Sequence, residues 1–160
     1  MNILNSKDCL NNMNVIDSRD LHDRLEELEN QHNEYLAAED EVERLKDLVK
    51  ENDSEKNLSD LEDAISDFDA LIPLDQDEIK ELEELQTMRD DVTDWEYGAT
   101  LINEGHFVKY CQELCEDVGD IPKGLPWYIA NAIDWEQVAS YMEQDYSEVT
   151  YQGETYYYNS

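Results

Sequence analysis

The stretch that decides the fold is residues 17–51, DSRDLHDRLEELENQHNEYLAAEDEVERLKDLVKE, which contains neither glycine nor proline. Apolar residues recur in it at intervals of seven, at Leu21, Leu28, Tyr35, Val42 and Val49. A period of seven keeps one narrow apolar seam on the same side of a helix, as in coiled coils and helical hairpins. The sequence therefore predicts one long helix whose seam packs against another helix.

The start of this helix is predicted from its acidic residues. Asp17 is the expected N-cap, because its carboxylate can accept hydrogen bonds from the first-turn N–H groups, and Asp20 places a negative charge at the positive end of the helix dipole. A second, partial apolar stripe flanks the seam, at Leu25, Ala38, Leu45 and Leu48, while neighbouring positions hold Arg24, Gln31 and His32.

Two further helices are predicted before residue 98. Residues 52–57 (NDSEKN) form a polar break, and the capping box of residues 59–62 (SDLE) would start a helix that Pro73 ends. Its apolar positions are Leu61, Ile65, Phe68, Leu71 and Ile72. Asp75 and Glu78 repeat the capping pattern for a third helix, which Gly98 would end or bend. The apolar positions of this third helix are Ile79, Leu82, Leu85, Met88, Val92 and Trp95.

Turn-forming residues become more frequent after residue 98, which predicts a second module. A fourth helix is expected over residues 103–118, with an apolar face formed by Phe107, Cys111, Leu114, Cys115 and Val118. Asp134 and Gln137 would cap a fifth helix. Alternating residues on both sides of Gln152-Gly153 predict a β-hairpin. The predicted fold class is mainly α: an acidic helical region over 1–97, as a hairpin, bundle or coiled coil, and a small α+β module over 98–160 that ends in the hairpin.

The charge of the chain points to a basic partner. Its 42 Asp and Glu residues outnumber 11 Lys and Arg, giving a net charge of −31. Such an excess disfavours direct binding to DNA, RNA or an anionic membrane, because each would add repulsion. Two interpretations remain. The acidic surface is only solvated, or it imitates a row of phosphates and enters a basic DNA-binding groove.

The carboxylates of interest are those without a neighbouring base. Between Lys56 and Lys80 there are eight acids and no base, and no Lys or Arg follows residue 123. Carboxylates three or four residues apart on a helix lie roughly 5–6 Å from one another. The predicted phosphate-mimicking residues are Asp60, Glu62, Asp63, Asp67, Asp69, Asp75, Asp77, Glu78, Asp134, Glu136, Glu143 and Asp145.

Catalytic and metal-binding patterns are weak, so we expect no enzyme, no metal site and no cofactor. The histidines are scattered, at His22, His32 and His106, and no H-x-x-x-H pattern is present. A zinc site from His106, Cys111 and Cys115 is a weak alternative to buried structural thiols. The third cysteine is Cys9, and three cysteines with no framework spacing disfavour a disulfide-stapled secreted protein. Without a signal-peptide or membrane-spanning pattern, the expected location is the cytoplasm.

The C-terminal module carries a spaced pattern of aromatic, acidic and turn residues. It runs Phe107-x-x-Tyr110-x-x-Glu113-Leu114-x-x-Asp117-x-Gly119-x-Ile121-Pro122, continues with Tyr128-Ile129 and Ile133-Asp134-Trp135-Glu136-x-x-Ala139, and ends with Asp145-Tyr146 and Gly153. Over about 60 of the 160 residues this pattern resembles the C-terminal part of ArdA-type antirestriction proteins. Those are acidic DNA mimics of phages and conjugative elements that bind type I restriction-modification enzymes, usually as dimers.

The resemblance implies a DNA-mimic inhibitor that blocks the DNA-binding groove of a host defence enzyme, with a type I restriction-modification enzyme as the favoured partner. By position it implies subunit contacts at Tyr128, Ile133, Asp134, Trp135 and Tyr146. The alternative interpretation is that the aromatic residues of this module form its hydrophobic core. Two alternatives remain from the sequence: an anti-CRISPR protein, or a coiled-coil adaptor or structural phage protein whose seam pairs with a partner helix.

Overall fold

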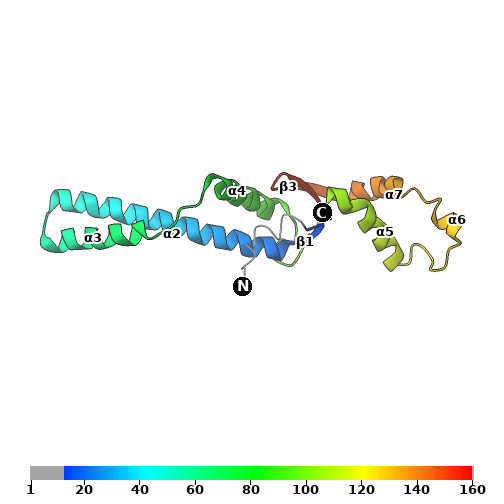
Figure 1. The fold of residues 1–160 in the computed structure, drawn as a ribbon, viewed down its shortest axis with the longest axis horizontal. Helices are drawn as coiled ribbons and strands as arrows, with labels where there is room; N and C mark the ends of the chain where they lie inside the picture. The colour runs from blue at the N-terminus through cyan, green and yellow to red at the C-terminus, as the bar shows by residue number, and fades with distance from the viewer. Residues whose placement is uncertain (1–12, 160) are drawn as a thin grey trace. The chain divides into compact units, whose positions relative to one another are not determined.

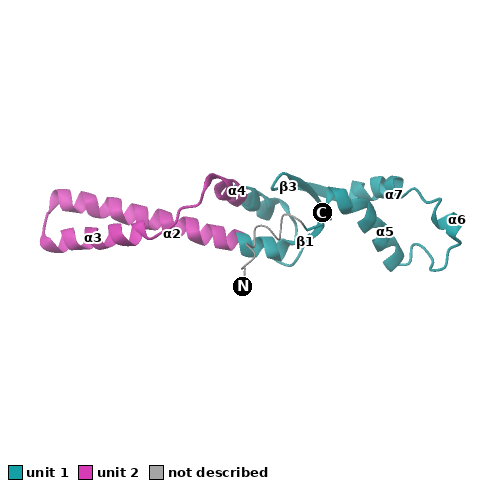
Figure 2. Ribbon diagram, in the orientation of Figure 1, with its two compact units in different colours: residues 1–24, 83–160 teal, residues 25–82 magenta. Residues whose placement is uncertain are grey.

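The computed structural model describes residues 13–159, which are mainly helical and carry a small antiparallel sheet, as predicted. The chain forms two compact units (Figure 2). Among the described residues, unit 1 combines 13–24 with 83–159, and unit 2 is 25–82. The predicted boundary between residues 97 and 98 differs from this division, because segments far apart in the chain pack together in unit 1.

Helix α2 (Ser18–Glu51) begins where the sequence places it. The Asp17 carboxylate accepts a hydrogen bond from the backbone N–H of Arg19 at 2.9 Å, which confirms Asp17 as the N-cap. The Arg19 guanidinium also donates to this carboxylate, at 2.8 and 3.1 Å. These hydrogen bonds, led by the side-chain bond, hold the pKa of Asp17 below its ordinary value.

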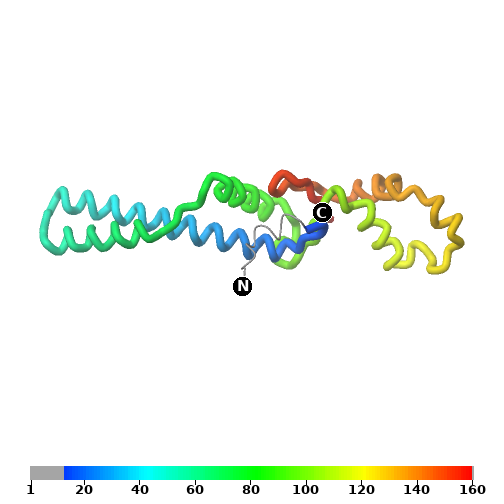
Figure 3. Tube along the Cα trace, in the orientation of Figure 1, coloured from blue at the N-terminus to red at the C-terminus, as the bar shows by residue number. Residues whose placement is uncertain are grey.

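Unit 2 is a helical hairpin in which α3 (Glu55–Asp69) runs back along α2 (Figures 1 and 3). The rings of Tyr35 and Phe68 pack with their centroids 4.9 Å apart, and the Gln31 amide donates to the carbonyl of Ile72 at 3.0 Å. Val42 and Leu45 of α2 are buried. Of the arrangements left open by the sequence, the chain therefore forms the hairpin.

The start and end of α3 differ from the prediction. Ser54, not Ser59, is the N-cap: its hydroxyl accepts from the N–H of Asn57 at 3.3 Å, so residues 55–58 add a turn to the helix. The helix ends at Asp69, and Ile72 is 76% exposed instead of joining the apolar stripe. Pro73 explains this end, since it disfavours the helical conformation of the residue before it.

Helix α4 (Gln76–Asp91) begins with the predicted capping box. The Asp75 carboxylate accepts from the N–H of Glu78 at 2.8 Å, and the Glu78 carboxylate accepts from the N–H of Asp75 at 3.0 Å. The helix ends seven residues before Gly98. Turns with left-handed residues at Asp94 (φ 61°) and Gly98 (φ 101°) follow, and they bury Val92 and Trp95.

The sheet of unit 1 has four antiparallel strands in the order β1-β2-β4-β3: β1 (Val15–Asp17), β2 (Thr100–Asn103), β3 (Tyr146–Tyr151) and β4 (Glu154–Asn159). Strands β3 and β4 form the predicted hairpin. Its turn residues Gln152 and Gly153 both have positive φ (52° and 78°), as a type I′ turn requires. Strands β1 and β2 were not predicted, because three or four residues are too few to show a period.

Short helices complete unit 1: η1 (Glu104–His106), α5 (Phe107–Asp117), α6 (Trp127–Ala130), α7 (Trp135–Met142) and η2 (Glu143–Asp145). Helix α5 starts four residues later than predicted, because Asn103 belongs to β2 and caps η1 through a hydrogen bond from the N–H of Gly105. Asp134 caps α7 at the N–H of Gln137 (3.1 Å), as predicted. Part of the core is formed by Ile102, Phe107, Cys111 and Ala139.

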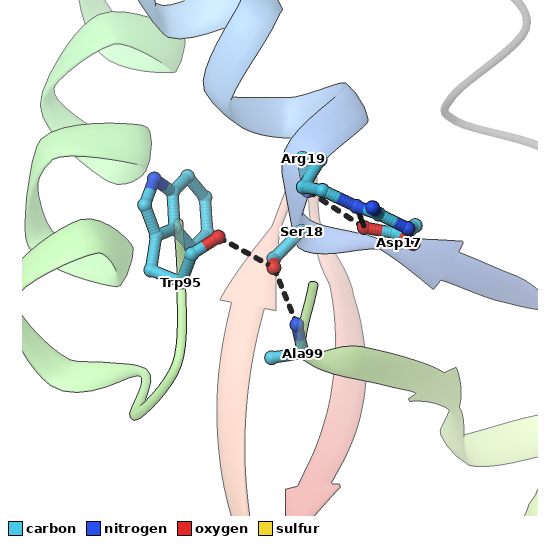
Figure 4. A network of polar contacts seen from close by, with 5 residues as sticks. All are labelled: Asp17, Ser18, Arg19, Trp95 and Ala99. Atoms are coloured by element: carbon cyan, nitrogen blue, oxygen red, sulfur yellow. Dashed lines mark hydrogen bonds and ion pairs between the residues drawn. The ribbon is translucent and has the colours of Figure 1, made fainter. Parts of the chain in front are cut away.

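A buried serine connects the two segments of the chain that make up unit 1 (Figure 4). The Ser18 hydroxyl donates to the carbonyl of Trp95 at 2.8 Å and accepts from the N–H of Ala99 at 2.7 Å. The Ser18 N–H donates to the carbonyl of Ala99 at 2.8 Å. Ser18 is fully buried, so water cannot replace these partners.

Replacing Ser18 by alanine tests this junction. We expect Ser18→Ala to destabilise unit 1 by about 1–3 kcal/mol, because the Trp95 carbonyl and the Ala99 N–H lose a buried partner. Urea unfolding followed by tryptophan fluorescence measures the change, since all three tryptophans lie in unit 1. Ser140→Ala, at an exposed position of α7, is the control and should shift stability by less than about 0.5 kcal/mol. Equal effects of the two substitutions would contradict the assigned role of Ser18.

Candidate acidic binding surface

The five predicted carboxylates of α3 form two rows on the helix. Asp60, Asp63 and Asp67 follow the i, i+3, i+7 spacing of one side, and Glu62 and Asp69 share another side seven residues apart. The helix packs against α2 through the face that carries Phe68. The two rows border the remaining, solvent-facing surface of α3.

Four of these five carboxylates are unopposed. Glu62, Asp63, Asp67 and Asp69 are exposed and make no ion pair or side-chain hydrogen bond with any residue of the described range. Asp60 differs, because the Lys56 ammonium lies 2.7 Å from its carboxylate. The prediction that Asp60 is unopposed is therefore wrong, because this ion pair forms across one helical turn.

The three acids before and within the first turn of α4 have mixed roles. Asp75 and Glu78 are both used in the capping box described above. Asp77 is exposed and has no side-chain partner among residues 13–159. The capping carboxylates stabilise the start of α4, so they are poor candidates for a surface whose only role is to meet a partner.

The four acids predicted in the C-terminal module all lie in unit 1. Asp134 caps α7, and the Glu143 carboxylate accepts from the Tyr157 hydroxyl at 3.1 Å. Burial, followed by this bond to Glu143, raises the pKa of Tyr157 to about 12, so the phenol remains a donor at neutral pH. Glu136 and Asp145 are exposed, with no side-chain partner in the described part of the chain.

The charge of unit 2 is strongly one-sided. Residues 25–82 contain 21 Asp and Glu and 5 Lys and Arg, a net charge of −16. Helix α2 offsets part of its own charge through ion pairs of Arg44 with Glu41 at 2.7 Å and of Lys50 with Asp47 at 3.0 Å. No base follows Lys56 in α3, so the unopposed charge of the hairpin includes the second half of that helix.

The predicted subunit contacts divide between surface and core. Tyr128 is 60% exposed, next to Trp127 at 76%, and their rings meet edge to face with centroids 5.8 Å apart. Ile133 and Trp135 are half-buried. Tyr146 packs edge-on against Phe107 at 5.2 Å and so belongs to the core. The sequence prediction omitted Trp127, because exposure cannot be read from residue type.

The module's aromatic residues divide between its core and its surface. Tyr151, Tyr156 and Tyr158 are buried in the core, whereas Trp127, Tyr128 and Tyr141 lie on the surface.

The cysteines and histidines form no metal-binding cluster within residues 13–159. Cys111 and Cys115 are buried, and burial raises the pKa of Cys111 to about 11, which keeps it a neutral thiol at neutral pH. His22 accepts a hydrogen bond at Nδ1 from the Trp95 indole at 3.0 Å. Cys9 lies outside the described residues.

No helix of the described range is long and apolar enough to cross a membrane. Comparison with known proteins finds no matching family model, no matching curated protein and no matching solved structure.

Neutralising selected acids separates the two kinds of carboxylate in unit 2. We expect Asp63→Asn with Asp67→Asn to raise the thermal midpoint at low ionic strength, because like charges on α3 repel. The gain should shrink in 1 M NaCl, where the Debye length is about 3 Å.

Asp75→Ala should instead lower stability by about 1 kcal/mol, since α4 loses its cap. Circular dichroism melts at both salt concentrations measure this, and a stabilising Asp75→Ala would refute the capping role.

Proposed function

We propose that this protein is a non-catalytic inhibitor that enters the DNA-binding groove of a host defence enzyme and excludes DNA by one-to-one occupancy. The carboxylates Glu62, Asp63, Asp67 and Asp69 take the place of backbone phosphates. The observation that carries the proposal is that these four side chains are exposed on one short helix and unopposed within the described residues. The inhibitor would act in the cytoplasm of the host cell.

The physical basis is that phosphate contacts dominate non-specific DNA affinity. Lysine and arginine side chains of a DNA-binding groove gain most of this affinity by neutralising phosphates and releasing counterions. Asp63 and Asp67 are four residues apart, at roughly 5–6 Å, and Glu62 and Asp69 add two fixed negative charges on the second row of α3. Copying the charge is enough to compete, because this part of DNA binding carries no sequence information.

The class of target comes from the C-terminal resemblance. The pattern that starts at Phe107 and ends at Gly153 is similar to ArdA-type antirestriction proteins, which favours a type I restriction-modification enzyme. A CRISPR effector, whose nucleic-acid channel is also basic, is the alternative target within the same mechanism.

The burial of the heptad seam favours the inhibitor over a coiled-coil adaptor. Leu21, Leu28 and Val42 are at most 6% exposed, and Tyr35 packs on Phe68 of the same chain. An adaptor would need this seam free to receive a partner helix. Val49, the last residue of the seam, is half-buried, so the chain itself covers most of the seam that suggested an adaptor.

We also propose a homodimer through the α6–α7 region of unit 1. Trp127, Tyr128 and Tyr141 are each at least 60% exposed, and large aromatic residues are enriched at subunit interfaces. The resemblance to a family of dimers supports this choice.

Neutralising the α3 carboxylates should abolish inhibition. The variant with Glu62→Gln, Asp63→Asn, Asp67→Asn and Asp69→Asn should inhibit DNA cleavage by a type I restriction enzyme at least about tenfold less well, because it loses four charges that meet basic side chains. A cleavage assay with increasing inhibitor measures this. For the unchanged protein, the inhibitory concentration should rise steeply between 50 and 200 mM salt, and it should match the enzyme concentration at low salt.

The matched control neutralises four exposed acids of α2: Glu34→Gln, Glu39→Gln, Asp40→Asn and Glu43→Gln. This control removes the same charge and should retain most of the inhibition. Equal loss in both variants would contradict the assignment to α3, and inhibition that is independent of salt would contradict phosphate mimicry itself.

The dimer is tested by the mass of the protein in solution. Sedimentation equilibrium should give twice the chain mass of 18.8 kDa, and Trp127→Asp with Tyr128→Asp should give the monomer, because buried charges would oppose association. Val108→Asp, at an exposed position of α5, is the control and should stay dimeric. A monomer at all concentrations would refute the proposal.

A further inference from the structure

A cleft of about 380 Å³ opens in unit 1, beside the turn that follows α4. It is built from residues of unit 1, whereas the α3 carboxylates belong to unit 2. Its wall includes the turn residues Asp94 and Gly98, two tyrosines, Tyr110 of α5 and Tyr146 of β3, and Asn159 at the end of β4. We propose that this cleft receives one arginine side chain from a basic protein partner.

The cleft carries a negative charge that no lining residue offsets. Asp94 is exposed, and its carboxylate has no ion pair or hydrogen bond with a described residue. No lysine or arginine is among the lining residues, and only two bases occur anywhere in residues 98–160. A cation from outside the chain would therefore meet an uncompensated carboxylate there.

The two tyrosines of the cleft can bind a planar cation. Tyr110 and Tyr146 are half-buried, and their hydroxyls make no hydrogen bond within the described part of the chain. Burial, followed by the neighbouring Tyr110, raises the pKa of Tyr146, so this ring is a neutral phenol at neutral pH. A guanidinium can stack on a phenol ring and donate to its oxygen, and it has five N–H donors for the surrounding acceptors.

The size of the cleft fits a single side chain. Its volume is near the lower end of the range for small-molecule sites, about 300–1,000 Å³. At its wall Ala99 carries only a methyl group, and the absent side chain of Gly98 makes room for the Arg19 guanidinium, which is held by Asp17 at 2.8 Å. Asp94 keeps its position through the turn, where its carbonyl accepts hydrogen bonds from the N–H groups of Tyr97 (2.9 Å) and Gly98 (3.1 Å).

A second copy of this chain is a poor donor of that arginine. The arginines of this chain already have partners within it: Arg19 pairs with Asp17, Arg44 pairs with Glu41, and Arg24 and Arg89 also interact with other residues. A basic DNA-binding protein is attracted to a chain with a net charge of −31 and brings arginines of its own. The identity of the protein that supplies the arginine rests on the proposed function. The chemistry of the cleft does not, and it can be tested on the isolated protein.

The test is a titration followed by NMR, with Nα-acetyl-arginine-N-methylamide as the probe. We expect saturable shifts at the backbone amide of Asp94 and at the rings of Tyr110 and Tyr146, with a dissociation constant on the order of 1–10 mM for such a small ligand. The equivalent lysine derivative should bind at least about threefold more weakly, because its ammonium cannot stack as a plane. The norleucine derivative should not bind.

Asp94→Asn is the decisive variant, since asparagine also tolerates the left-handed conformation at this position. It should weaken arginine binding by about three- to tenfold, whereas Asp90→Asn, an exposed position of α4 outside the cleft, should leave binding unchanged. Equal effects of the two variants, or non-saturating shifts spread over all the acidic residues, would overturn the proposal. Binding of the probe by a protein that inhibits no nuclease would refute the proposed function and leave the cleft assignment standing.

Discussion

The hydrogen bonds of Ser18 are the constraint on which unit 1 depends. This residue stands at the first turn of α2 and contacts the carbonyl of Trp95 and both polar groups of the Ala99 backbone. The contacts hold β1 beside β2, where Ile16 pairs with Leu101, and they fix the turn that carries Asp94. A hydroxyl, which both donates and accepts, meets this need in a buried site where water is absent.

The excess of negative charge is distributed between two uses. Asp17, Asp75 and Asp134 accept hydrogen bonds from the first turns of α2, α4 and α7, so their charge stabilises the chain that carries it. The four unopposed acids of α3 have no such contact and repel one another. In the proposed function, a cationic partner neutralises these carboxylates on binding and so removes the repulsion between them.

The unopposed acids of α3 and the exposed aromatic residues of unit 1 suit different kinds of contact. Charged contacts act at long range, weaken with salt and speed association, whereas the exposed rings of Trp127 and Tyr128 can bury apolar area that salt does not screen. In the proposals above, the α3 charges meet the target and the rings meet a second subunit. The arginine cleft would add one specific contact, because its carboxylate and phenols suit a planar cation.

The sequence by itself determined the elements whose signals lie within a few residues. The extent of α2, the caps at Asp75 and Asp134 and the Gln152-Gly153 turn are examples, because each hydrogen bond or backbone requirement joins near neighbours. Local signals failed where two were close together, as when Ser54 and not Ser59 capped α3. Only the tertiary structure decided that β1 pairs with β2 and which residues line the cleft. It also decided that a lysine opposes Asp60 but not Asp63, and that Trp127 is exposed while Tyr156 is buried. Most of these depend on contacts between residues far apart in the chain, and the rest on side-chain geometry, which no spacing of residue types encodes.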